Sequence, residues 1–137
     1  MSIHFNFVDV DECPLKRRNI KNWINNTVVN ENKLVGEIQY IFCSDNYLLK
    51  INKKFLDHDY YTDIVTFDYD EKNIISGDIY ISIDRVKENA KIFEVDFNNE
   101  LLRVIIHGIL HLIGYNDKSD IEKNIMRNKE NYYLSIF

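Results

Sequence analysis

The chain has 137 residues, of which 45% are hydrophobic and 13% aromatic, and it carries a formal net charge of −5. This composition is that of a globular protein and excludes an intrinsically disordered one. The length predicts one domain, residues 1–137, with a single core. The negative charge argues against binding to nucleic acid through the overall field, but it leaves room for a local basic patch.

The sequence also gives an expectation about the compartment. It contains no apolar run of 18 residues, and acidic residues stand early in the chain where a signal peptide needs an apolar stretch. Cys13 and Cys43 form no CxxC pair and are interpreted as small buried hydrophobic residues in a reducing compartment. We therefore expect a soluble, cytoplasmic protein with no membrane association.

The first part of the chain predicts a strand followed by a helix. Residues 3–10 alternate apolar and polar over much of their length, which is typical of a strand. Pro14 suits the first turn of a helix that runs to about Asn30. One side of this helix is apolar and consists of Leu15, Ile20, Trp23, Ile24 and Val28.

A second strand and helix are expected after Gly36, which separates them from the first helix. Residues 37–43 are rich in β-branched and aromatic side chains and predict a strand. Ser44 is a suitable N-cap for a helix through about Phe55.

The remaining elements are predicted from turn residues and capping residues. Gly77 marks a bulge or a close backbone approach within its strand. In order, the sequence predicts a loop at 58–63, a strand at 64–69, a turn at 70–73, a strand at 74–83, a helix capped by Asp84 to about Phe93, a helix capped by Asp96 or Asn98 to about Ile113, and a helix from a Ser119/Glu122 capping box to about Leu134.

This order of elements predicts an α+β fold. Four strands would form one small mixed sheet, and about five helices would pack on it. The helix ending near Ile113 is the most apolar of them, so we expect it at the centre of the structure.

That helix carries an unusual row of polar residues. Within residues 101–113, the positions that are not large and apolar are Arg103, His107, Gly108 and His111. An α-helix turns about 100° per residue, so Glu100 joins Arg103, His107 and His111 in one polar stripe. Burying such a stripe is costly unless something satisfies it. A metal ion does so for two imidazoles spaced i, i+4, so His107 and His111 are predicted metal ligands.

A third ligand is predicted just beyond the helix. Gly114 is suited to the left-handed turn that ends a helix, and a turn there would bring Asp117 back toward the two histidines. Three protein ligands leave one position for water, which is the pattern of a catalytic zinc site. Zinc proteases with H-E-x-x-H use the Glu as general base, and Gly108 stands at that position here.

Three segments resemble the YbeY family of bacterial endoribonucleases. HGILHLIGYND at 107–117 resembles the family signature H-G-x-L-H-L-x-G-Y-D-H, which is highly specific. INKKFLDHDYYTDIVTFDY at 51–69 and SGDIYIS at 76–82 resemble two upstream family motifs. The resemblance implies a single-domain metalloprotein, usually with one zinc ion, that cuts single-stranded RNA in ribosomal RNA maturation and ribosome quality control. It also implies ribosomal RNA and ribosomal proteins as partners, and we expect a monomer.

The chain departs from the family pattern at the site. Asp117 stands where the family usually has His, and its negative charge should make the metal a weaker Lewis acid. Leu56 stands where the family has an arginine that is expected to contact phosphate, and Tyr61 stands where it has proline. The candidates for the missing basic group are Lys53, Lys54, His58 and Arg103.

Roles for further residues are expected as follows. Arg103 is predicted to stabilise charge on the phosphate, with a structural ion pair, for example with Glu100, as the alternative. Asp63 and Asp78 would orient the histidines or cap turns. Tyr60 and Tyr61 would stack on unpaired bases or pack in the loop. Two basic clusters are interpreted as solvated helix faces: Lys16, Arg17, Arg18 and Lys21 near the start, and Lys118, Lys123 and Arg127 near the end.

Three other functions stay open at this stage. A protease-like metal hydrolase is disfavoured by Gly108. A non-haem iron oxygenase also uses two histidines and a carboxylate, but the helical spacing is not the usual one. A non-catalytic ribosome assembly factor with a structural metal gains weight from Leu56.

Overall fold

The structure, a computed structural model, describes residues 2–137 and confirms the predicted α+β class. Within these residues, four strands form one mixed sheet in the order β1-β2-β4-β3. β1, β2 and β4 are parallel, and β3 runs antiparallel to β4. The strands are β1 (Ser2–Phe7), β2 (Leu34–Cys43), β3 (Ile64–Asp68) and β4 (Ile74–Ser82).

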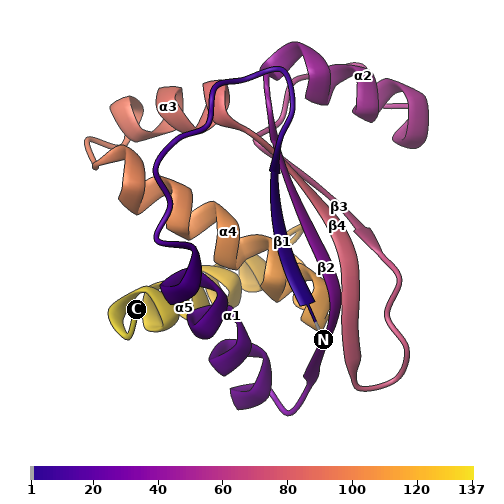
Figure 1. Cartoon of the computed structure of the whole chain (residues 1–137), viewed down its shortest axis with the longest axis vertical. Coiled ribbons are helices and arrows are strands. Elements are labelled where there is room, and N and C mark those ends of the chain that lie inside the picture. Colours follow the sequence, from indigo (N-terminus) through magenta and orange to yellow (C-terminus); the bar gives the residue numbers. More distant parts are fainter. Residues whose placement is uncertain (1) are drawn as a thin grey trace.

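Five helices within the described residues pack around this sheet. Figure 1 shows α1, α4 and α5 on one side of the sheet and α2 on the other, at its upper edge. The helices are α1 (Arg17–Asn30), α2 (Asp45–Leu56), α3 (Ile83–Ile92), α4 (Phe97–Ile113) and α5 (Asp120–Ser135). None of the helices within residues 2–137 is long and apolar enough to cross a membrane.

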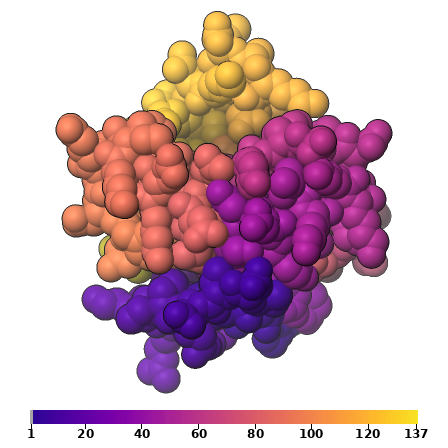
Figure 2. All heavy atoms as spheres, turned by 90° about the horizontal axis from the view of Figure 1, so that it is seen from above, coloured from indigo at the N-terminus to yellow at the C-terminus, as the bar shows by residue number. Residues whose placement is uncertain are grey.

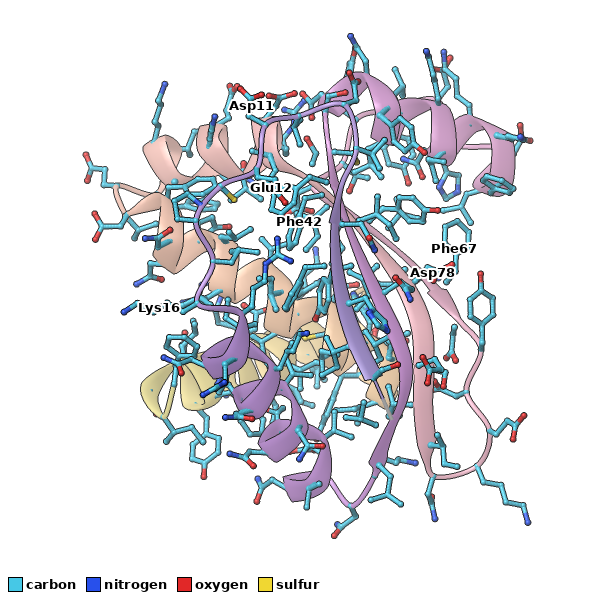
Figure 3. The ribbon with its side chains drawn as sticks, viewed as in Figure 1. Asp11, Glu12, Lys16, Phe42, Phe67 and Asp78 are labelled. Carbon is cyan, nitrogen blue, oxygen red and sulfur yellow. The ribbon has the colours of Figure 1, made fainter. Side chains whose placement is uncertain are left out.

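Side chains alternate along each strand, so successive residues face either the side of the sheet with α1, α4 and α5 or the opposite side. Phe42 points toward the helices, while Phe67 and Asp78 lie on the opposite side (Figure 3). On the helix side, Tyr40 is fully buried and its hydroxyl donates to the carbonyl of Ile105 in α4 at 2.8 Å. A smaller core between α2 and the other face contains Leu48 and its neighbours.

α4 lies at the centre of the structure, as predicted. It contacts α1, α3 and α5 as well as β3 and β4. Ile105, Ile106, Ile109 and Leu110 are completely buried, which leaves the polar stripe as the side of the helix that other polar groups can reach.

The predicted start of the first helix is wrong. β1 ends at Phe7, and α1 begins at Arg17 rather than near Pro14. The segment between them has no regular secondary structure, and its apolar residues Val10, Cys13 and Leu15 pack against the main core without forming a helix. No side chain caps the N-terminus of α1, so the sequence offered no capping signal for its true start.

Two further boundaries differ from the prediction. Gly36 lies inside β2, close to an irregularity in its register with β4, and does not separate two elements. α3 begins at Ile83, and its N-cap is Ser82, whose hydroxyl accepts from the backbone N–H of Arg85 at 3.1 Å. Asp84 therefore lies in the first turn of the helix and is not its cap.

Other local predictions are confirmed. Ser44 caps α2, and Ser119 with Glu122 forms the capping box of α5. Gly77 packs against the carbonyl of Phe67 and the side chain of Leu112 from α4, which is the close approach expected there.

α2 and α3 meet through a polar network at the edge of the sheet. Asp45 accepts from the hydroxyl of Ser82 at 2.6 Å and pairs with Arg85 at 2.9 Å. Figure 2, seen from above, shows these two helices side by side, with the N-terminal segment and α5 bordering them. This network fixes the start of α2 relative to α3.

Candidate metal centre

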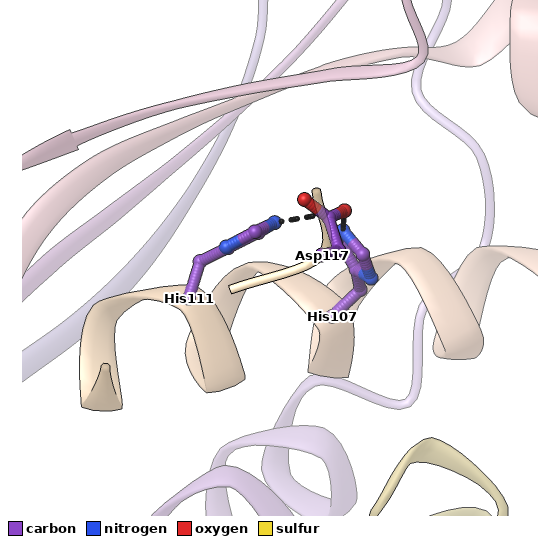
Figure 4. Close-up of side chains that lie close together, drawn as sticks. All are labelled: His107, His111 and Asp117. Carbon is purple, nitrogen blue, oxygen red and sulfur yellow. Dashed lines mark ion pairs between the residues drawn. The ribbon is translucent and has the colours of Figure 1, made fainter. Parts of the chain in front are cut away.

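α4 and the turn after it bring His107, His111 and Asp117 together, as predicted. The Oδ2 atom of Asp117 lies 3.3 Å from Nε2 of His107 and 3.3 Å from Nε2 of His111. One ligand atom from each residue lies within 4.8 Å of the others. Figure 4 shows both imidazoles rising from the same side of α4 toward the carboxylate. Gly114 ends the helix with a φ of 125°, which only glycine adopts readily, and so turns the chain back over the histidines.

The second nitrogen of each imidazole is held by an acceptor. Nδ1 of His107 lies 2.6 Å from Oε2 of Glu130, and Nδ1 of His111 lies 2.9 Å from the carbonyl oxygen of Tyr115. A carboxylate and a carbonyl only accept, so each Nδ1 donates a proton. In the neutral rings the lone pair is then on Nε2 and points toward Asp117.

This arrangement concentrates lone pairs and negative charge at one point. Burial lowers the pKa of His111, and the adjacent His107 lowers it further. Burial also favours the neutral form of His107, but the hydrogen bond and charge of Glu130 raise its pKa. The two imidazoles cannot both carry a proton at low cost with ring centres 4.5 Å apart. A divalent cation satisfies all three acceptors at once, so the donor set fits a metal ion.

Glu130 of α5 is the buried carboxylate that orients His107, and it was not among the site residues predicted from the sequence. Its other oxygen, Oε1, accepts a hydrogen bond from Nη1 of Arg103 at 3.0 Å. Although burial opposes ionisation, the hydrogen bond from His107 and the one from Arg103 lower the pKa of Glu130. Arg103 donates in addition to Asn131 at 3.0 Å, so its predicted alternative role as a structural ion pair is realised with Glu130 and not with Glu100.

The turn that carries Asp117 is anchored to α1. Glu31, at the C-terminal end of α1, accepts from the hydroxyl of Tyr115 at 2.6 Å and from Lys129 at 3.1 Å, and it also accepts from Tyr133. A carboxylate at the C-terminal end of a helix is unfavourable for the helix dipole, so these donors stabilise it there. Through Tyr115, this cluster fixes the carbonyl that holds His111.

Two cavities within the described residues border the site, and His107 lines both of them. The acidic cavity, of about 260 Å³, is lined by residues that include Asp63, Glu100, Arg103, His107, Asp117, Arg127 and Glu130. The other cavity, of about 390 Å³, is lined by His107, Asp117, Lys123, Asn124, Met126, Arg127 and Glu130; it is called the basic cavity for Lys123 and Arg127, although Asp117 and Glu130 balance their charge. Burial raises the pKa of Asp63 and of Glu100 in the acidic cavity.

Of the two aspartates expected to orient histidines, only Asp63 lies near the site. It lines the acidic cavity with His107, but no hydrogen bond joins the two side chains within the described residues. Asp78 lies on the face of the sheet away from α4, where it accepts from the hydroxyl of Tyr69 at 3.2 Å. The expectation that Asp78 orients a histidine is therefore wrong, and the alternative that it caps a turn or bulge stays a prediction.

The residues expected to bind substrate lie on α2 and the loop after it and line neither cavity. Lys53 pairs with exposed Asp59 at 3.1 Å, and Lys54 lies over the ring of Phe55. His58 stacks on Tyr60, and Tyr61 lies under the guanidinium of Arg85. The structure brings none of these four candidates into contact with the ligand histidines.

Gly108 explains in physical terms why the site lacks a protease base. It faces the sheet, and a Cβ added to it would lie 2.9 Å from Ile79 and 3.0 Å from Ile64. Position 108 therefore cannot place a glutamate carboxylate beside the metal ligands without displacing the core.

We expect Gly108→Ala to destabilise the protein by about 1–2 kcal/mol, because overpacking outweighs the gain in helix propensity. The midpoint of urea unfolding, measured with chelator present, checks this. A midpoint equal to or above that of the wild type would show that the contact is not tight.

The fold and the site define an α+β protein whose buried central helix presents two histidines which, with an aspartate from the following turn, could hold a metal ion. A family model described as Endoribonuclease YbeY matches residues 7–137 of the chain. The chain belongs to this family, which confirms the resemblance found in its motifs.

Individual relatives agree with this assignment. An Endoribonuclease YbeY from Flavobacterium psychrophilum is 50% identical over 135 residues, which cover 98% of this chain and 96% of that protein. The protein of the same name from Parabacteroides distasonis is 48% identical over 136 residues, covering 99% of this chain and 96% of that protein. The solution structure of a Thermotoga maritima protein, 31% identical, matches with a TM-score of 0.69 over 98% of this chain and 87% of that one.

Proposed function

We propose that this chain is a zinc-dependent endoribonuclease that cuts single-stranded ribosomal RNA during its maturation and in ribosome quality control. Residues 1–137 would act as one hydrolase domain with one zinc ion, as a monomer in the cytoplasm and in contact with the ribosome or its proteins. The proposal rests on the family of the chain and on the names of its relatives, together with the donor set described above.

One observation carries the metal-dependent part of the proposal. Both Nδ1 atoms are held by acceptors, so both Nε2 lone pairs converge on the carboxylate of Asp117. Two histidine nitrogens and one carboxylate oxygen are a common donor set for a catalytic zinc ion, whose fourth tetrahedral position is taken by water. A zinc ion held there supplies Lewis acidity toward a phosphoryl oxygen and a nucleophilic water at neutral pH.

The protein residues then supply orientation. Glu130 and the carbonyl of Tyr115 hold the two imidazoles in the tautomer that leaves Nε2 free. Arg103 is committed to Glu130 and Asn131, so we assign it to positioning Glu130 and not to direct contact with the phosphate. The role first expected for Arg103, charge stabilisation, is the weaker alternative.

The test combines metal analysis with RNA cleavage by the purified full-length protein. We expect about one zinc per chain, cleavage of single-stranded ribosomal RNA, little cleavage of a matched duplex, loss of cleavage with chelator, and recovery on addition of zinc. Casein serves as a control substrate for the protease-like alternative.

The alternatives predict different results. Cleavage that survives removal of all metal would contradict the proposed chemistry. Tight RNA binding without cleavage under any divalent metal would favour the assembly factor with a structural metal. Degradation of casein but not of RNA would favour the protease-like hydrolase.

A further inference from the structure

Arg127 of α5 is the basic side chain that borders both cavities of the metal centre. It lines the acidic cavity and the basic cavity, as His107, Asp117 and Glu130 also do. Its sequence neighbours suggested only a solvated helix face, but the fold places it in the lining of the same two cavities as His107 and Asp117. Lys123, one helical turn earlier on α5, lines the basic cavity only.

The guanidinium of Arg127 has donors to spare for a ligand. Its side chain is 56% exposed, and its nearest ionic contact is Oε1 of Glu130 at 3.8 Å, which is longer than a hydrogen bond. Glu130 is already engaged by Arg103 and His107 through shorter contacts. Arg127 is therefore an exposed positive charge at the rim of the site, whereas Arg103 is largely buried and paired with Glu130.

The charged residues that line the two cavities indicate what Arg127 would do. Asp117 and Glu130 both border the two cavities, and Asp63 and Glu100 add further carboxyl groups on one side. An RNA phosphate that approaches Asp117 and the two histidines is repelled by this negative charge, and a chain of net charge −5 gives it no general attraction. A guanidinium at the rim offsets this repulsion and binds phosphate oxygens with two parallel hydrogen bonds.

We propose that Arg127, assisted by Lys123, binds the RNA phosphate next to the metal centre and so takes the role that the family assigns to an arginine at the position of Leu56. This inference rests on the proposed function, because it assumes that RNA is the substrate. It also explains why α2 and its loop need not supply the basic group, since Lys53, Lys54 and His58 line neither cavity.

The test compares Arg127→Gln with Arg18→Gln, which removes the same charge from an exposed position on α1 that borders neither cavity. Binding of a fluorescent single-stranded ribosomal RNA oligonucleotide is measured by anisotropy, with chelator present and at several salt concentrations. We expect Arg127→Gln to bind about ten-fold more weakly and to lower the salt slope by about 0.7, the value for one lost phosphate contact. Arg18→Gln should match the wild type.

Two further variants separate charge from geometry. Arg127→Lys keeps the charge but not the paired hydrogen bonds, so its affinity should fall between wild type and Arg127→Gln. Lys123→Gln should show a smaller loss than Arg127→Gln. Zinc affinity, measured by competition with a chelator, should stay within about two-fold of the wild type in every variant, because Arg127 does not contact a ligand histidine.

The outcomes also separate this inference from the proposed function. Equal affinity and salt slope for Arg127→Gln and Arg18→Gln would overturn the inference, even if the wild type cuts RNA. A large loss of zinc affinity in Arg127→Gln would also overturn it, because Arg127 would then act on Glu130. A wild type that binds RNA without cutting it contradicts the proposed cleavage, while a selective loss of binding in Arg127→Gln still supports the phosphate contact.

Discussion

Replacing His111 by alanine is expected to abolish stoichiometric zinc binding and to reduce RNA cleavage to the level seen with chelator. His111 supplies one of the three converging donor atoms, and alanine leaves a histidine and a carboxylate that cannot hold the ion alone. Loss of an outer partner of a ligand costs about 10–100-fold in metal affinity, so loss of a ligand should cost at least about 100-fold.

Metal content by mass spectrometry and zinc affinity by chelator competition check this expectation. His4→Ala is the matched control, since His4 is exposed on β1 and lies outside both cavities of the site. The assignment of the ligands fails if the His111 variant keeps one zinc per chain at the affinity of the wild type.

Replacing Glu130 by alanine is expected to lower the free energy of unfolding by about 3 kcal/mol and to weaken zinc binding by about 10–100-fold. The stability effect arises because Arg103, whose side chain is 20% exposed, loses its carboxylate partner. The effect on zinc arises because the imidazole of His107 loses the acceptor that holds it in place. The two effects come from one residue but are measured separately.

Urea unfolding with chelator present reports the stability effect without any contribution from bound metal. Glu130→Gln keeps an acceptor for His107 but loses the charge, so its zinc affinity should fall between those of the wild type and Glu130→Ala. Glu88→Ala, at an exposed position of α3, controls for the loss of a carboxylate. A loss of stability no larger than that of Glu88→Ala would contradict the buried ion pair.

The ligand set was predictable because it is local in sequence. Helix periodicity places His107 and His111 on one side of α4, and the glycine stop at Gly114 turns the chain so that Asp117 comes back toward them. The α+β fold class was predictable from the same kind of local pattern, because hydrophobic periodicity and capping residues indicate most of the strands and helices.

The partners of the ligands were not predictable in this way, because they come from elements distant in the chain. Glu130 lies 23 residues beyond His107, and Glu31 lies 84 residues before Tyr115. One signal was nevertheless present: Glu130 shares the buried face of α5 with Met126 and Tyr133, where a charged residue is out of place unless it has a partner. Pro14 alone does not predict where α1 begins, because no capping side chain accompanies it and the residues up to Lys16 have no regular secondary structure.

The anchoring of Tyr115 by Glu31 has a consequence for local opening of the structure. A turn after a helix ordinarily frays at low free-energy cost, independently of the elements around it. Here the turn cannot swing away from α4 without breaking the contact of Tyr115 with Glu31, whose side chain is only 9% exposed. We therefore expect the segment that carries Asp117 to open together with the end of α1 and with α5, as one cooperative unit. Its backbone amides should exchange with solvent at the slow rate of that unit, so the aspartate is held in register with the two histidines for as long as the three elements stay packed.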